Sequence, residues 1–319
     1  MLKLGILASS LLLASNLAQA QDAVQKSEKA FAAFEKLFGV TKGKRRNHTK
    51  GFCIEGQFSP ADPAILKYSL SPIFRGSSNF VGRVSHKGGK NKTPDNKYGL
   101  YGLAFELTTA DGDAHIINMN TEHFFPVATP EAFTELLIAK ATSKEAVKAF
   151  AANSPRLRAY KAYHGKLDKS LRPYEGATYN SINSFYLVNE KGERTAVRWS
   201  FVPSGNQGLQ LEPKEDFLLE NMKANLTAGN VSWDMVITLA NEGDVIDNPS
   251  VLWTGDHTRI TAARLTVTSA MTETDGQCDE INYDPLVLTD GFEPSEDPLL
   301  EARSLIYAIG VGKRLSEKE

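Results

Sequence analysis

The hydrophobic pattern along the chain changes from a helical period to short strand-like runs. Residues 22–38 carry apolar side chains at helical spacing and end at Gly39, which predicts a helix that stops at a glycine. Beyond this segment, runs rich in aromatic and β-branched residues are separated by turn-forming pairs such as Asp111-Gly112. These runs predict strands at residues 51–58, 80–85, 101–109, 115–120, 184–188, 195–202, 232–239 and 262–269.

Helical patterns interrupt the strands and follow them. Thr129-Pro130-Glu131 combines a helix N-cap residue with proline at the first helical position, so a helix is expected from Pro130 to about Leu137. Further helices are expected at residues 144–152, 214–226 and 298–315. Strands in hairpin-like pairs, with helices inserted between them and added at the end, predict a single domain of the α+β class. Its centre would be an antiparallel eight-stranded β-barrel with an interior filled by side chains.

The first twenty residues have the features of a signal peptide. Lys3 provides a positive charge, residues 4–13 form an apolar stretch, and Ala18-Gln19-Ala20 has the small-residue pattern of a cleavage site. The mature chain is therefore expected to span residues 21–319 and to be exported, with the periplasm as its compartment. The apolar stretch is shorter than the roughly 18 residues that a membrane helix needs, and no later run reaches that length, so no membrane span is expected.

Composition narrows the classes of partner. The 319 residues are 41% hydrophobic and 23% charged, which is typical of a globular protein. Because 36 basic residues nearly balance 38 acidic ones and no long basic run occurs, nucleic acid is not expected as a partner. Export would permit a disulfide between Cys53 and Cys278, but two isolated buried thiols are at least as good an interpretation of two distant cysteines.

Two segments contain residues that could carry chemistry. Residues 45–51 place His48 in a polar stretch at the start of the first strand, and an imidazole can move protons near neutral pH. A basic surface loop would have the same composition. In the last helix, Arg303 and Tyr307 share one face, so the guanidinium can donate to the phenolic oxygen and favour the phenolate, a ligand for ferric iron. A tyrosine packed in the core beside a surface arginine would show the same spacing.

These segments belong to an ordered series of motifs that resembles the haem catalases, and among them the short catalase-related peroxidases. Arg45, His48, Lys50 and Gly51 match the distal pattern Arg-x-x-His-x-Lys-Gly. The further matches, in chain order, are Pro72-Ile73-Phe74, Arg83-Val84-Ser85, Tyr101-Gly102-Leu103-Ala104, Asn120-Thr121, Phe124-Phe125, Asp247-Asn248-Pro249, Gly291-Phe292-Glu293-Pro294-Ser295, Arg303, Tyr307 and Arg314. The resemblance covers roughly residues 40–315 and implies a catalase-like barrel in minimal form, without the extra C-terminal domains of large catalases.

The resemblance also implies a haem b cofactor between two sets of residues. Tyr307 would bind the ferric iron as phenolate, with Arg303 donating a hydrogen bond to that oxygen. On the opposite face His48 would act as general base and then general acid, Asn120 would orient the peroxide, and Ser85 would hold His48. The remaining implied contacts are Arg45, Arg83 and Arg314 with the haem propionates, and Phe124 or Phe125 at the distal side.

Some features depart from the family pattern. Val311 stands where many catalases have histidine, and residues 52–55 place Phe-Cys-Ile-Glu where the family has small residues. The sequence also ends soon after Leu315, so the helical domain that follows the proximal tyrosine in large catalases is not expected here. A wider access to the iron would follow, and this favours bulky organic hydroperoxides as substrates.

The function that the resemblance implies is an exported haem peroxidase. It would reduce hydrogen peroxide or organic hydroperoxides through a ferryl intermediate, with an electron donor that the sequence does not identify. Other functions stay open: a true catalase, an enzyme that rearranges fatty-acid hydroperoxides on the same haem, and a non-enzymatic barrel that binds haem or another apolar ligand. The presence of both His48 and Asn120 argues against the last, because haem storage needs no distal acid–base group. The oligomeric state is left open.

Overall fold

The structure, a computed structural model, describes residues 3–318, with side chains from residue 20 onward. Its first helix, α1 (Lys3–Phe38), includes the helix expected at residues 22–38 and ends just before Gly39, which has a φ of +79°. The predicted signal peptide, residues 1–20, lies partly outside the described residues and stays a prediction. Within residues 3–318 no helix combines the length and the apolar character that crossing a membrane requires.

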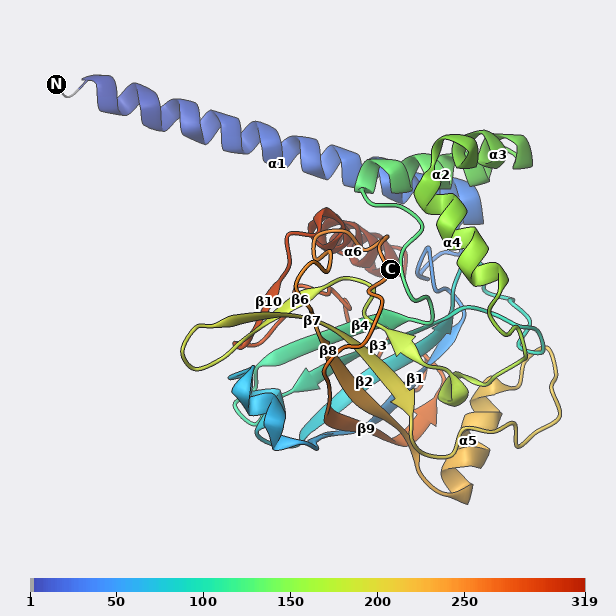
Figure 1. The fold of residues 1–319 in the computed structure, drawn as a ribbon. Coiled ribbons are helices and arrows are strands. Elements are labelled where there is room, and N and C mark those ends of the chain that lie inside the picture. Colours follow the sequence, from blue (N-terminus) through green and yellow to red (C-terminus); the bar gives the residue numbers. More distant parts are fainter. Residues whose placement is uncertain (1–2, 319) are drawn as a thin grey trace.

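Among the described residues, eight antiparallel strands close into a barrel (Figure 1). The order around the ring is β7, β5, β4, β3, β2, β1, β9 and β8, and β8 pairs with β7 to close it. The strands are β1 (Gly51–Pro60), β2 (Ser78–His86), β3 (Tyr101–Thr108), β4 (Ala114–Asn120), β5 (Tyr179–Asn180), β7 (Arg194–Pro203), β8 (Val231–Leu239) and β9 (Arg259–Met271). The predicted α+β fold with an antiparallel eight-stranded barrel is confirmed.

One predicted strand lies outside the ring. It forms β6 (Phe185–Val188), which pairs with β7 on one side and with β10 (Phe292–Pro294) on the other. The place between β4 and β7 is taken by the two residues of β5 instead. The chain turns between β5 and β6 at Ile182, which has a φ of +64°. A short run rich in aromatic and β-branched residues identified β6 as a strand, but such a run does not determine which strand it pairs with.

Side chains fill the barrel. Along β1 and β3 alternate residues point inward, so Ile54, Leu103 and Phe105 belong to one buried hydrophobic core. The intervening residues Cys53 and Ala104 belong to a separate cluster on the outer face. The predicted filling of the interior is therefore confirmed, and a ligand that needs its own cavity must lie against the outer wall.

The inserted helices begin at side-chain caps. α2 (Pro130–Thr142) starts after Thr129, whose side chain accepts a hydrogen bond from the backbone of the first turn, as the sequence predicts. α3 (Lys144–Asn153) agrees with the expected second helix. α4 (Pro155–Gly165) was not expected, and it starts after Ser154 with a cap of the same kind. Its surface is mostly polar, so it lacks the apolar stripe by which sequence patterns identify helices.

The last two α-helices in chain order are α5 and α6. α5 (Leu218–Ala228) begins later than the expected residue 214, because the Asp95 carboxylate accepts hydrogen bonds from the N–H groups of Phe217 and Leu218. α6 (Pro298–Ser316) starts after the N-cap Asp297 and agrees with the helix expected at residues 298–315. The short 3-10 helices are η1 (Pro63–Lys67), η2 (Pro72–Phe74) and η3 (Tyr174–Gly176).

Helices α1, α2 and α6 lie together on one side of the barrel (Figure 1). A small apolar cluster joins them, with Phe34 from α1, Leu137 from α2 and Ile306 from α6. The ring of Phe34 also meets Phe133 of α2 edge to face at 5.7 Å between ring centres. These helices therefore form a second layer over the outer wall of the barrel.

Candidate active site

A cavity of about 1050 Å³ lies between the barrel wall and the helical layer. Its walls are mostly apolar, and the polar groups are concentrated in a few places. The barrel and the segment before β1 contribute Arg45, His48, Arg83, Ser85, Gly102, Asn118 and Asn120. Helix α6 contributes Arg303, Tyr307 and Arg314. Two motifs more than 250 residues apart, around His48 and Tyr307, thus surround one space.

A row of residues across three strands shapes the wall beside His48. Ser85 of β2 lies opposite Gly102 of β3, and Gly102 lies opposite Asn120 of β4. Because residues directly opposite in a sheet point to the same face, Ser85 and Asn120 both face the cavity. Glycine at the middle position leaves a gap between them, and the His48 ring occupies it: a Cβ at Gly102 would lie 2.7 Å from Nδ1 of His48.

The backbone at His48 is held in an uncommon conformation. Its φ is +57°, in the left-handed region that non-glycine residues rarely adopt. The Arg83 guanidinium stabilises this turn, because Nη1 donates to the carbonyl of His48 at 2.7 Å and Nη2 to that of Thr49 at 3.0 Å. Gly51 leaves room for this, since a Cβ there would lie 2.8 Å from the guanidinium. Strain of this kind, fixed by surrounding contacts, is common at functional sites.

The electrostatics of the site keep the His48 imidazole neutral. Burial, and after it the positive charges of Lys87 and Arg83, lower the pKa of His48 to about 3. The Ser85 hydroxyl lies 3.0 Å from Nδ1, which leaves Nε2 to exchange a proton with a molecule in the cavity. The Asn120 carbonyl accepts a hydrogen bond from the backbone of Glu122 at 2.9 Å. The Asn120 amide N–H groups make no hydrogen bond to the residues that the structure describes, so they can donate to a ligand.

The phenolic oxygen of Tyr307 has a different partner from the expected one. Asn118 donates to it from Nδ2 at 2.5 Å, and the same amide donates to the carbonyl of Tyr283 at 2.9 Å. The Arg303 guanidinium lies 5.9 Å from the centre of the Tyr307 ring and donates to Asn183 at 2.5 Å. The hydrogen bond expected from Arg303 to Tyr307 is thus not formed in this structure, and Asn118 makes it instead.

Three arginines at one end of the cavity form a positive cluster. Arg83 Nε lies 2.6 Å from Glu273, and Arg45 Nη1 lies 2.6 Å from Asp279. Arg314 Nε is buried 3.8 Å from Asp279 and has no hydrogen-bond partner among the described residues. Burial, and then the charges of the other two arginines, lower the pKa of Arg45 to about 10. Lys44 and Lys318 also pair with Glu273 and Asp279, at 2.7 Å each, so positive charges exceed negative ones in the cluster and favour an anionic ligand.

The two candidate phenylalanines have different surroundings. Phe125 lines the cavity. Phe124 instead packs edge to face against Tyr160 and Tyr163, with ring centres 5.8 and 5.2 Å apart. Of the two, the structure therefore places Phe125, and not Phe124, at the wall of the site.

The residues around the cavity fit a haem. Tyr307 offers a hard anionic oxygen ligand for ferric iron, and the walls suit a flat apolar ring. The arginine cluster, with the unpartnered Nε of Arg314, suits the carboxylates at one edge of that ring. Within residues 3–318, no group of three or more His, Cys, Asp or Glu side chains could hold a bare metal ion.

Several residues of the site are not identified by the sequence motifs. Asn118 had a usable signal, since it lies two residues before Asn120 in one strand and must share its face. Glu273 and Asp279 lie in a loop after β9 and had none, because their partners are far away in the sequence. The same loop contains Cys278, which forms a disulfide with Cys53, the outcome that the sequence left open.

Comparison with known proteins gives the family. The sequence model of the catalase family matches residues 34–318, which is most of the chain. The chain belongs to the catalase family. The resemblance seen in the sequence motifs is thereby confirmed.

Among individual relatives, short proteins match over nearly their whole length. A catalase-related peroxidase of Synechococcus elongatus is 37% identical, over 90% of this chain and 88% of its own. A catalase-related peroxidase of Mycolicibacterium paratuberculosis is 28% identical, over 90% of this chain and 94% of its own. The crystal structure of a fungal catalase shares the fold, with a TM-score of 0.71 and 16% identity, and this chain covers 60% of its length.

Proposed function

We propose that this chain is a haem peroxidase that reduces hydrogen peroxide or organic hydroperoxides. Membership of the catalase family, and the match to two catalase-related peroxidases over 90% of the chain, support a peroxide-reducing haem enzyme. The observation that carries the proposal is the placement of a neutral His48 and of Tyr307 around one cavity. An acid–base group on one side and a ligand for iron on the other are what peroxide cleavage requires.

The haem would be held by contacts at its centre and at one edge. Tyr307 is the proposed iron ligand, as phenolate, and Asn118 donates to its oxygen. Arg45, Arg83 and Arg314 would bind the two propionates. We propose haem b, because the only two cysteines of the chain are bonded to each other and neither is free to attach a haem covalently. When bound, the haem iron supplies the redox chemistry of O–O cleavage, which an anionic oxygen ligand promotes.

Side chains of the cavity would transfer the proton and orient the peroxide. His48 takes a proton from the peroxide on Nε2 and returns it to the departing oxygen, so that water or an alcohol leaves. Ser85 holds the imidazole through Nδ1. The free amide N–H groups of Asn120 donate to the peroxide and fix its position beside His48. A neutral imidazole is needed for this role, since an imidazolium could not accept the proton, and burial and nearby positive charges hold the pKa of His48 below neutral.

The apolar lining of the cavity supports organic hydroperoxides as substrates. The cavity of about 1050 Å³ would hold the haem together with the peroxide, and its walls are mostly apolar. Apolar side chains of α1 and α2, among them Phe34 and Leu137, line the side that the helical layer provides. An alkyl group attached to the peroxide would be desolvated there.

We also propose that the protein is exported to the periplasm. The signal-peptide pattern that ends at Ala18-Gln19-Ala20 supports this. The Cys53 to Cys278 disulfide gives independent support, because disulfides form and persist in oxidising compartments.

The test compares His48→Ala with the wild type after loading with haem. We expect equal haem content and a loss of about 10²- to 10⁴-fold in peroxide-dependent oxidation of a reducing dye, measured with hydrogen peroxide and with an alkyl hydroperoxide. His257→Ala is the control, since His257 pairs with Asp244 and does not line the cavity. Equal rates for wild type and His48→Ala would contradict the mechanism. Vigorous oxygen release with little dye oxidation would favour a true catalase.

A further inference from the structure

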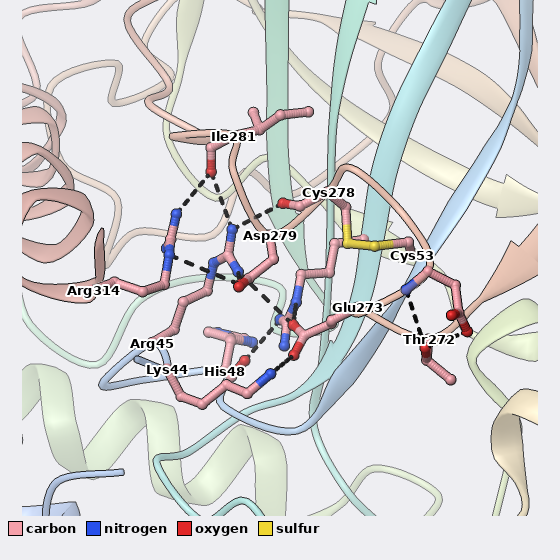
Figure 2. The surroundings of a disulfide bond; sticks show 12 residues. Lys44, Arg45, His48, Cys53, Thr272, Glu273, Cys278, Asp279, Ile281 and Arg314 are labelled. Atoms are coloured by element: carbon pink, nitrogen blue, oxygen red, sulfur yellow. Dashed lines mark hydrogen bonds and ion pairs between the residues drawn. A yellow bond between two sulfur atoms is a disulfide. The ribbon is translucent and has the colours of Figure 1, made fainter. Parts of the chain in front are cut away.

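The disulfide joins the first barrel strand to a loop near the other end of the chain. Cys53 of β1 and Cys278 are 225 residues apart in sequence, and both are fully buried. Cys278 belongs to the 272–283 loop, which follows β9 (Figure 2). The loop lies directly on the bridge, since a Cβ at Gly276 would come within 2.7 Å of the Cys53 Cβ. The bridge therefore fixes the position of this loop on the barrel wall.

The 272–283 loop contacts the arginines of the cavity through two acidic residues that do not themselves line it. Its residues Glu273 and Asp279 do not line the cavity, yet they contact Arg83, Arg45 and Arg314, which do. Figure 2 shows Arg45 and Arg314 both pointing toward Asp279, next to the disulfide. All three hydrogen bonds of the Arg45 guanidinium to described residues go to this loop: to Asp279 at 2.6 Å and to the carbonyls of Cys278 and Ile281 at 3.1 Å each.

The bridge and the arginine cluster are also neighbours in the sheet. Cys53 lies directly opposite Arg83 in the pairing of β1 with β2. Burial, and then the charges of Arg83 and Arg314, lower the pKa of Arg45, and the carboxylates of Glu273 and Asp279 offset the repulsion among the three guanidiniums. Glu273 and Asp279 are only 8% exposed, and water cannot easily replace their contacts. The placement of Arg45 and Arg314 thus depends on the loop, whereas Arg83 is also held by the carbonyls of His48 and Thr49.

We propose that the 272–283 loop, fixed by the Cys53 to Cys278 disulfide, positions Arg45, Arg83 and Arg314 to receive the two carboxylates of the haem. The proposal rests on the proposed function, and it gives the disulfide and two acidic residues a role in cofactor binding. Glu273 and Asp279 are positioning residues, since they act through the arginines. Groups behind the binding residues commonly control affinity in this way, by keeping charged side chains in one geometry.

The test uses two probes that differ only at the carboxylates: ferric haem and its dimethyl ester. Each is titrated into the purified, oxidised wild type and into the double variant Cys53→Ser/Cys278→Ser, and binding is followed by the haem absorption band. We expect the double variant to bind haem about tenfold more weakly or worse, and the ester about as well as the wild type does. Circular dichroism establishes that the variant is folded.

A second set of variants keeps the bridge, in case its removal prevents folding. Glu273→Gln and Asp279→Asn remove one carboxylate each, and both should weaken binding of haem while leaving binding of the ester unchanged. Glu293→Gln is the matched control, because Glu293 pairs with Arg194 at the exposed surface.

The outcomes separate the inference from the proposed function. Loss of binding that is equal for haem and ester, or no loss in any variant, would overturn the inference and leave the haem assignment standing. If the wild type binds neither probe, the proposed cofactor is wrong and the inference falls with it.

Discussion

The imidazole of His48 occupies the space that a side chain at Gly102 would fill. A Cβ on Gly102 would lie 2.7 Å from His48 Nδ1 and 2.8 Å from its Cε1. Carbon atoms cannot approach nitrogen or carbon so closely without displacement. The position of the acid–base group is therefore set by the lack of a side chain on β3 as much as by its hydrogen bond to Ser85.

The first prediction concerns this gap. Gly102→Ala should move the imidazole away from Ser85 and reduce peroxide-dependent dye oxidation by about 10²-fold, because a misplacement of about 1 Å has effects of that size. Haem content should not change, since Tyr307 and the arginines are untouched. Gly76→Ala is the control, as nothing lies within 4 Å of the added carbon. Full activity in Gly102→Ala would show that the ring does not need this gap.

The second prediction compares the two groups near Tyr307. Asn118→Leu removes the donor 2.5 Å from the phenolic oxygen and keeps the volume of the side chain, whereas Arg303→Lys changes a group that contacts the ring and Asn183. The ferric absorption bands of the haem-loaded protein should shift more in Asn118→Leu, since the loss of a donor makes the phenolate a stronger ligand. A larger shift in Arg303→Lys would instead favour the contact expected from the sequence.

The third prediction is a pH dependence of stability caused by Glu175. Burial raises the pKa of this carboxyl to about 7, and its Oε2 has no hydrogen-bond partner in the part of the chain that the structure describes. The folded state keeps the proton up to about pH 7, while the unfolded chain releases it near pH 4.5, so the stabilisation is complete below pH 4.5 and is lost as the pH rises to about 7. At about 1.4 kcal/mol per pH unit, the loss is about 3 kcal/mol.

Urea unfolding at pH 5 and pH 8 measures this effect. Glu175→Gln cannot ionise and should show a smaller fall in the free energy of unfolding between the two pH values than the wild type. Glu220→Gln, at an exposed ion pair with Lys223, should behave as the wild type does. The same fall in Glu175→Gln as in the wild type would exclude Glu175 as its source.

The fourth prediction concerns processing. Mass spectrometry of the protein from its native host should find Gln21 at or near the N-terminus, because the pattern before it is that of a signal-peptide cleavage site. An intact Met1 on the folded, haem-loaded protein would contradict export.

Local patterns predicted the elements well and their partners less well. Runs rich in aromatic and β-branched residues predicted β3, β4 and β6, since such residues favour a strand whatever the strand pairs with. The start of α5 was misplaced because its cap comes from Asp95, more than 100 residues earlier. The sequence pattern within the helix cannot predict such a contact, because the partner lies in a distant segment.

In the candidate site, too, residues could be predicted from the sequence but their contacts with distant residues could not. His48, Ser85 and Tyr307 were found because the family spacing marks them, and the structure brings them to one cavity. Asn118 could have been found from alternation with Asn120, but its bond to Tyr307 joins residues 189 apart. The role of Cys53 could not be predicted, because it depends on where the 272–283 loop lies on the folded barrel.

The proposed haem site depends on Tyr307 as the residue that binds the iron, and Tyr307→Phe tests this most directly. The substitution removes one oxygen atom from a half-buried side chain, so the barrel should fold as before by circular dichroism. After loading with haem under identical conditions, haem content and the ferric absorption spectrum are measured against the wild type. If Tyr307 binds the iron, the variant is a folded protein that has lost its haem or shows displaced ferric bands. Wild-type haem content with an unchanged spectrum would contradict it.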